Sequence, residues 1–199
     1  MRKLLLAAFP PEINAIENEF ASRADIVCSC VGVGITEAAV RTAELIIKYQ
    51  PERVIFLGSC GALNSKHQLL SVATARTVSL ADSLALNGKS YFPEIYQQRF
   101  SADLEFLEAL NSEVIKANFY SPLSISKDSA TAQGVYSELG DFENLELFGV
   151  AQACSHFNIK WNNLSVITNY LGTDAHHQWQ ENYSQAATLT LAALRLIGI

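Results

Sequence analysis

The sequence is poor in positive charge. Only 14 lysines and arginines stand against 20 acidic residues in a chain of 199, and the net charge is −6. A nucleic-acid-binding protein carries a clustered basic patch or stripe, so we expect no nucleic-acid partner. The charge leaves room for a small anionic ligand, because backbone amides and helix ends can outweigh it locally.

Long apolar runs are also missing. A membrane-spanning helix takes about 20 consecutive apolar residues, and no stretch approaches that length. The opening segment MRKLLLAAFPPE superficially resembles a signal peptide, but its apolar part is short and is cut by Pro10, Pro11 and Glu12. A first β-strand accounts for it better. We therefore expect a cytoplasmic protein with no membrane partner.

Paired metal-ligand spacings are absent from the sequence. Its four cysteines stand in apolar or tight-turn surroundings: Cys28, Cys30, Cys60 and Cys154. We expect free thiols in a reducing compartment. His176 and His177 are adjacent, so on a helix they point about 100° apart, and no other His or Cys stands at ligand spacing from them. The sequence therefore predicts no metal site.

Strand-like and helical patterns alternate along the chain, whose hydrophobic content of 49% is enough for a full core. Strands are expected at 3–9, 25–34, 53–63, 69–81, 119–126 and 160–169, with an irregular section at 82–101. Helices are expected at 12–21, 36–49, 102–113, 141–157 and 176–197. Fully apolar strands that alternate with helices indicate a three-layer α/β/α sandwich with a mostly parallel central sheet. With no linker or repeat, one domain over 1–199 is predicted.

Ligands of such sheets bind beyond the carboxyl ends of the strands. The segments to inspect are therefore 9–12, 32–34, 58–61, 124–128 and 169–172. Glu12 stands at a strand-to-helix turn, where it is either a first-turn carboxylate that favours the helix dipole or a general base. Ser59 lies between glycines in GSCGAL, which is not the GxSxG elbow of nucleophilic serines. Its hydroxyl and the nearby amides suit a water or an oxyanion.

Among the remaining features, Glu146 and Asn169 each leave two interpretations open, whereas VGVGIT and Trp179 do not. VGVGIT (31–36) lacks the third glycine and the later acidic residue of a dinucleotide site, so it predicts only a tight turn. Glu146 is expected on the apolar face of helix 141–157, where a buried carboxylate needs strong donors; structural pairing and two vicinal sugar hydroxyls fit equally well. Asn169 ends an apolar strand, either to cap a turn or to contact a ligand. Trp179 is expected to pack the final helix.

Four motifs in order along the chain resemble the purine nucleoside phosphorylase/nucleosidase superfamily. AAFPPEINAIE resembles its opening strand with the catalytic glutamate, and VGVGITEAAVRTAELI with RVIFLGSCGAL resembles its glycine turn, helix and G-S-x-G segment. ENLELFGVAQAC resembles its E-M-E helix, with Leu145 in place of the methionine, and ITNYLGTDAHHQW resembles its closing strand. TNYLG…W also resembles futalosine hydrolases, which release hypoxanthine from futalosine in the menaquinone pathway.

The resemblance implies cleavage of the N-glycosidic bond of a purine nucleoside without a cofactor. Carried over by motif, Glu12 activates a water, Ser59 helps to place it, Glu146 binds the ribose hydroxyls and Asn169 contacts purine N7. Further substrate-binding residues are expected in the same motifs: Phe9, Gly34, Gly58 and Leu145. A homodimer is expected from the resemblance alone.

Two departures from the family pattern narrow this expectation. Phe56 stands where the family's phosphorylases have the arginine of RxGS that holds phosphate, so water is favoured as the nucleophile. TN stands where adenine-specific nucleosidases have SD, and Asn169 can donate a hydrogen bond but cannot deliver a proton. That favours a 6-oxopurine base. The alternatives are a methylthioadenosine/S-adenosylhomocysteine nucleosidase, a purine nucleoside phosphorylase, or a nucleoside-binding protein without turnover.

Overall fold

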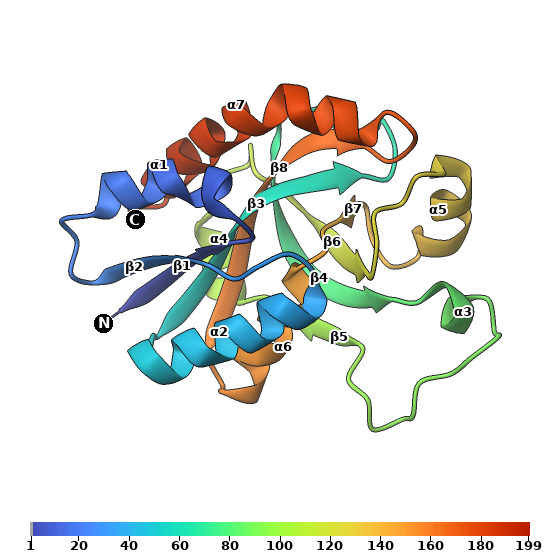
Figure 1. Cartoon of the computed structure of the whole chain (residues 1–199), viewed down its shortest axis with the longest axis horizontal. Coiled ribbons are helices and arrows are strands. Elements are labelled where there is room, and N and C mark those ends of the chain that lie inside the picture. The colour runs from blue at the N-terminus through green and yellow to red at the C-terminus, as the bar shows by residue number, and fades with distance from the viewer. Residues whose placement is uncertain (1) are drawn as a thin grey trace.

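An eight-stranded mixed sheet forms the centre of the computed structural model, which describes residues 2–199 (Figure 1). The strands are β1 (Lys3–Ala7), β2 (Ile26–Cys30), β3 (Arg53–Ala62), β4 (Val72–Ala81), β5 (Arg99–Ser101), β6 (Ile115–Pro122), β7 (Phe142–Glu143) and β8 (Lys160–Tyr170). The helices are α1 (Pro10–Phe20), α2 (Ile35–Tyr49), α3 (Ser83–Leu86), α4 (Leu104–Ala109), α5 (Ser129–Tyr136), α6 (Leu147–His156) and α7 (Ala175–Leu196). None of the helices in the described residues is long and apolar enough to cross a membrane.

Parallel pairing dominates the sheet. The order is β2-β1-β3-β7-β6-β4-β5, and β8 pairs with both β3 and β4. β1 pairs in parallel with β2 and β3, as do β3 with β8, β4 with β6, and β6 with β7. The antiparallel pairs are β3–β7, β4–β5 and β4–β8. The expected α/β fold is confirmed, with a sheet that is mixed rather than uniformly parallel.

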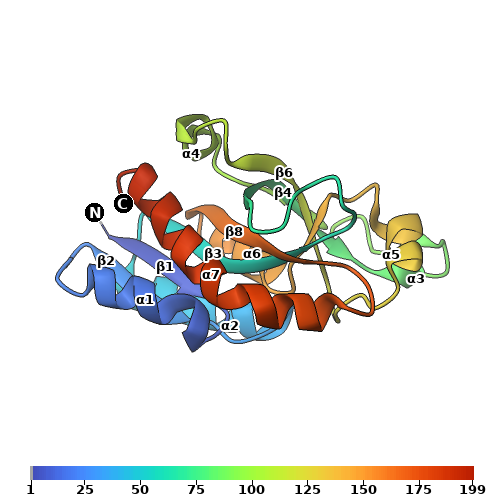
Figure 2. The same ribbon diagram turned by 90° about the horizontal axis from the view of Figure 1, so that it is seen from above.

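Helices cover both faces of the sheet. α1 packs with α7 on one side and α2 with α6 on the other, so the layers can be followed from top to bottom in Figure 1. α2 buries Ala38, Thr42, Leu45 and Ile46, which form one stripe at helical spacing. Strand β1 is buried along most of its length, as expected for a strand covered on both faces. Figure 2 shows α3 and α5 together at the end of the molecule away from both termini.

The expected helix over 141–157 is wrong at its start. Residues 142–143 form β7 instead, and α6 begins only at Leu147. The side-chain oxygen of Asn144 accepts the backbone N–H groups of Glu146 and Leu147 at 3.0 and 2.8 Å, which fixes the first turn there. Glu146 is consequently the N-cap residue of α6 and not a member of its apolar face.

Other boundaries differ for similar local reasons. The expected helix 102–113 is shortened to α4, which Asp103 caps by accepting the N–H of Phe106. The section 82–101, expected to be irregular, holds α3 and β5. Helix α5 occupies a segment for which no helix was expected, and Asp128 caps it by accepting the N–H groups of Ala130 and Thr131.

Candidate functional site

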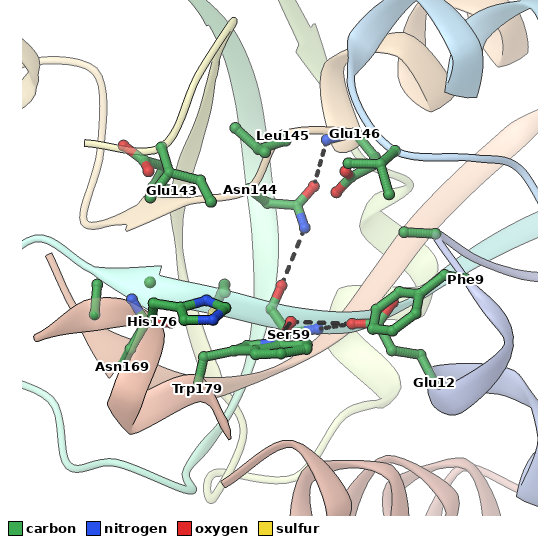
Figure 3. Close-up of a pocket in the computed structure, with 16 residues that line it drawn as sticks. Phe9, Glu12, Ser59, Glu143, Asn144, Leu145, Glu146, Asn169, His176 and Trp179 are labelled. Carbon is green, nitrogen blue, oxygen red and sulfur yellow. Dashed lines mark hydrogen bonds between the residues drawn. The ribbon is translucent and has the colours of Figure 1, made fainter. Parts of the chain in front are cut away.

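A cavity of about 400 Å³ lies at the carboxyl ends of β1, β3 and β8. Figure 3 labels ten of the residues that line it: Phe9, Glu12, Ser59, Glu143, Asn144, Leu145, Glu146, Asn169, His176 and Trp179. This is the edge of the sheet at which the strand order predicts a ligand site. Six residues expected to act on a substrate line the cavity: Phe9, Glu12, Ser59, Leu145, Glu146 and Asn169. The other two, Gly34 and Gly58, are not among its lining residues; Gly34 donates to Glu146, and Gly58 lies next to the carboxylate of Glu12.

The carboxylate of Glu12 is bound on one oxygen only. Pro10 starts α1, which places Glu12 in its first turn. The backbone N–H and the hydroxyl of Ser59 both donate to Oε1, each at 3.0 Å. Oε2 is buried and has no hydrogen-bond partner among residues 2–199. A side chain at Gly58 would place its Cβ 3.0 Å from Oε1, so the carboxylate would have to shift by a few tenths of an ångström to accommodate it.

Burial changes the acidity of this group. The pKa of Glu12 is raised to about 7, chiefly by desolvation and in smaller part by the negative charge of Glu146, while the hydrogen bonds from Ser59 oppose the shift. Glu12 as a whole residue is partly exposed, but its free oxygen is not. A carboxylate with a pKa near neutrality and an unused acceptor oxygen is suited to take a proton from a water.

Trp179 holds the Ser59 hydroxyl in place. Its indole Nε1–H donates to Ser59 Oγ at 3.3 Å, and the hydroxyl in turn donates to Glu12. The indole ring also lies near Phe9, with 5.9 Å between ring centroids, and stacks on Tyr183 at 5.1 Å. The expectation that Trp179 only packs the final helix is therefore incomplete, because its N–H faces the site. An aromatic residue on an amphipathic helix gives no signal of this in the sequence.

Glu146 is oriented by a glycine turn. Its Oε1 accepts the N–H of Gly34 at 2.9 Å, across 112 positions of sequence. Gly34 has a φ of 91°, a conformation that side chains disfavour, and it precedes α2. Glu146 is 6% exposed, and burial raises the pKa of its carboxyl although the Gly34 amide opposes this. Asn144, which no sequence pattern singled out, links it to β3 by donating to the carbonyl of Ser59 at 3.0 Å.

The amide of Asn169 is fixed from both sides. The hydroxyl of Thr168 donates to its Oδ1 at 3.0 Å, and its Nδ2 donates to the carbonyl of Tyr170 at 3.3 Å. Nδ2 carries two hydrogens, so one remains for the cavity. Gly61 makes room for this arrangement, because a Cβ there would lie 2.9 Å from Nδ2 and 2.8 Å from Leu171 Cδ2. Asn169 lines the cavity, and the second N–H of its amide is not used by Tyr170.

Glu143 is a third acidic residue of the cavity, and sequence reasoning missed it. It lies on β7 and is 5% exposed. The N–H of Ser126 donates to its Oε1 at 3.1 Å and the Ser126 hydroxyl to its Oε2 at 2.5 Å. Burial raises the pKa of its carboxyl. No Lys or Arg is among the described residues that line the cavity. Phe56, which stands where related phosphorylases have a phosphate-binding arginine, is buried in the core. With three carboxyl groups and no Lys or Arg in this lining, the site suits cations and hydrogen-bond donors.

Comparisons with known proteins agree in family and fold. Residues 10–197 match the family model described as "Phosphorylase superfamily". The chain is 26% identical over 171 residues to the 5'-methylthioadenosine/S-adenosylhomocysteine nucleosidase of Bacillus cytotoxicus, covering 78% of this chain and 73% of that one. It is 29% identical over 122 residues to the DeoD-type purine nucleoside phosphorylase of Bacillus velezensis, covering 60% and 48%.

Two solved structures from Helicobacter pylori share the fold over nearly the whole chain. One is an MTAN mutant with 5'-methylthioadenosine in its active site, with a TM-score of 0.87, 14% identity and coverage of 98% of this chain and 97% of that one. The other is a futalosine hydrolase mutant, with a TM-score of 0.87, 16% identity and coverage of 99% and 98%. At this level of identity, both likenesses speak for the fold alone.

Proposed function

Because the chain belongs to the phosphorylase superfamily, we propose that it is a purine nucleosidase, which cleaves the N-glycosidic bond of a purine nucleoside with water. The observation that carries the proposal is the half-satisfied carboxylate of Glu12. Ser59 occupies one oxygen, and the other is buried without a partner among the described residues, in the wall of a ligand-sized cavity. A group of this kind is suited to a general base, because the hydrogen bonds from Ser59 hold one oxygen and leave the other without a partner.

The reaction uses the two ends of the cavity differently. Water attacks C1′ of the ribose as the bond from C1′ to N9 breaks, and Glu12 takes the proton from the water. Positive charge develops on the sugar in the oxocarbenium-like transition state, and the carboxylates of Glu12 and Glu146 stabilise it. Glu146 holds the ribose hydroxyls. The electron pair of the broken bond goes to the base, which leaves as an anion stabilised by the N–H of Asn169 and is protonated afterwards by solvent.

Water is the better-supported nucleophile. Phosphate would bring negative charge into a cavity that already contains three carboxyl groups and, among its described lining, no Lys or Arg. Bound phosphate is normally held by such cations or by a ring of backbone amides. We therefore expect base release that does not depend on phosphate.

The choice of base follows from Asn169. Its oxygen already accepts from Thr168 and the residue lines the cavity, so its amide nitrogen can offer a donor to N7 or O6 of a 6-oxopurine. Within this class we propose futalosine, which would yield hypoxanthine and dehypoxanthinyl futalosine. The similarity to the nucleosidase of Bacillus cytotoxicus supports methylthioadenosine or S-adenosylhomocysteine to the same extent. The homodimer and the cytoplasmic location stay predictions.

Incubation of the purified protein with futalosine, inosine and methylthioadenosine tests this proposal. Each is assayed with and without phosphate, and the released base is identified by chromatography. Hypoxanthine from futalosine without phosphate supports the proposal in full, and adenine from methylthioadenosine supports the nucleosidase with the other base. Phosphate-dependent turnover would identify a phosphorylase. Binding of a nucleoside without any base release would identify a binding protein.

A further inference from the structure

Glu143 and Asn169 flank the same residue of the sheet. Gly61 on β3 pairs with Glu143 on β7 at one side and with Asn169 on β8 at the other. Side chains of residues paired across neighbouring strands point to the same face. Glu143 and Asn169 therefore share one face of the sheet, and the residue between them has no side chain.

The gap over Gly61 lets the amide of Asn169 lean toward β7. The ideal Cβ position at Gly61 lies 2.9 Å from Asn169 Nδ2, so the amide occupies space that a side chain would fill. Both Glu143 and Asn169 line the cavity. Figure 3 shows them at one end of it, with Glu12 and Phe9 at the other. The cleavage step proposed above places the sugar at Glu12, so the Glu143 end is the one that receives the base.

The carboxylate of Glu143 has acceptor capacity left. A carboxylate offers about four lone-pair sites, and Ser126 fills one on each oxygen. Burying a carboxylate with only two donors is costly, and the raised pKa of Glu143 reflects that cost. A further donor supplied by a ligand would offset it. Nothing in the cleavage step itself uses this residue.

We propose that Glu143 is a second base-recognition residue, which accepts the N1–H of a 6-oxopurine while Asn169 donates to O6 or N7 of the same base. The proposal rests on the proposed nucleosidase function and extends it. N7, O6 and N1–H follow one another around the edge of a 6-oxopurine as two acceptors and a donor, which matches the donor of Asn169 and the acceptor of Glu143. Adenine has an unprotonated N1, whose lone pair would face the carboxylate. Such a mismatch leaves buried polar groups unpaired and is strongly discriminated.

Binding of free bases to Glu143→Gln tests the proposal without knowledge of the natural 5′-substituent. The N–H of Ser126 keeps the amide oxygen of the new glutamine on its own side, so the NH₂ group replaces the other oxygen and offers a donor to the base. We expect calorimetry to show the ratio of hypoxanthine to adenine affinity falling about 10- to 100-fold, the size expected for a hydrogen bond to a charged group. 1-Methylhypoxanthine lacks the N1–H and should bind wild type weakly, with no further loss in the variant.

A matched control is Glu138→Gln, which removes one negative charge at an exposed residue that does not line the cavity. Its base preference should equal that of wild type. If Glu143→Gln keeps the wild-type preference while it is folded and still releases base from a nucleoside, then Glu143 only anchors the Ser126 segment. The inference is then wrong and the nucleosidase proposal stands. If wild type neither binds a free purine nor releases one from a nucleoside, the proposed function itself fails.

Discussion

The hydroxyl and the backbone N–H of Ser59 both donate to one carboxylate oxygen of Glu12, at 3.0 Å each. The other oxygen is buried and has no partner within residues 2–199. This asymmetry divides the carboxylate into an oxygen that is held and an oxygen that can react. Glu12 and Ser59 both line the cavity.

Glu12→Gln should abolish most of the turnover while it preserves binding. The amide keeps the shape of the side chain and an oxygen to accept from Ser59, but it cannot take a proton. Removal of a general base typically costs 10²- to 10⁴-fold in rate. Single-turnover base release should fall by that factor, whereas the affinity for the released base should change little. Near-normal rates in this variant would show that Glu12 is not the base.

The rate of base release should rise with pH up to neutrality. Burial raises the pKa of Glu12 to about 7, and only the ionised carboxylate accepts a proton. Below pH 7 the rate should therefore fall about tenfold per pH unit, with a plateau above. The measurement is single-turnover base release between pH 5 and 9. Glu12→Gln should lose this dependence, and a wild-type rate that stays flat across the range would contradict the assignment.

Much of the site could be expected from the sequence because it follows from topology. Glu12 and Ser59 are 47 residues apart, yet both stand where an apolar strand ends, and the ends of parallel strands meet at one edge of the sheet. The same rule placed Gly34 and Asn169 near them. The alternation of apolar strands and helices was likewise sufficient for the fold class, because burial on both faces leaves a continuous apolar run in each strand.

The remainder depends on contacts that local patterns do not encode. Glu146 was expected inside a helix because residues 141–157 show a helical spacing of apolar residues. The side chain of Asn144, however, accepts the N–H groups of Glu146 and Leu147, so the helix begins only at Leu147 and β7 can form before it. Glu143 was missed for the same reason. Its importance comes from pairing with Gly61, which is 82 residues earlier and is a matter of strand register. Trp179 reveals its contact with Ser59 only once α7 is packed on the sheet.

The raised pKa of Glu12 should make the free energy of unfolding depend on pH. Its folded pKa of about 7 lies above the ordinary value of 4.5, so the folded state holds this proton more tightly than the unfolded chain does. Stability is then lost as the pH rises from 4.5 to 7, by up to about 3 kcal/mol for a shift of this size. Glu12→Gln removes the ionisable group, so its melting temperature should exceed that of wild type at pH 8 by roughly 5–10 °C and approach it at pH 5. An equal difference at both pH values would mean that ionisation of Glu12 is not the cause.

Trp179→Phe should slow the reaction without much effect on substrate binding. The phenyl ring keeps an aromatic contact with Phe9 and with Tyr183 but lacks the N–H that donates to Ser59. The Ser59 hydroxyl is then free to rotate away from Glu12. A neutral hydrogen bond contributes about 1 kcal/mol, so we expect kcat to fall about five- to tenfold with KM nearly constant. A large rise in KM with unchanged kcat would indicate that Trp179 only shapes the cavity.

Asn169→Asp should shift the base preference from 6-oxopurines toward 6-aminopurines. Thr168 would still donate to one oxygen of the new carboxyl group, but the other would face the carbonyl of Tyr170, which lies 3.3 Å from the present Nδ2. The protonated acid carries a single proton, which can be donated to N7 of the base in place of that carbonyl, and its free lone pairs can accept from a 6-amino group. The ratio of kcat/KM for inosine to that for adenosine should fall about 10- to 100-fold. The control is Asn158→Asp, a change of the same kind at an exposed residue outside the cavity. If both variants keep the wild-type ratio, the base is not selected by Asn169, and the case for a 6-oxopurine substrate then rests on Glu143 alone.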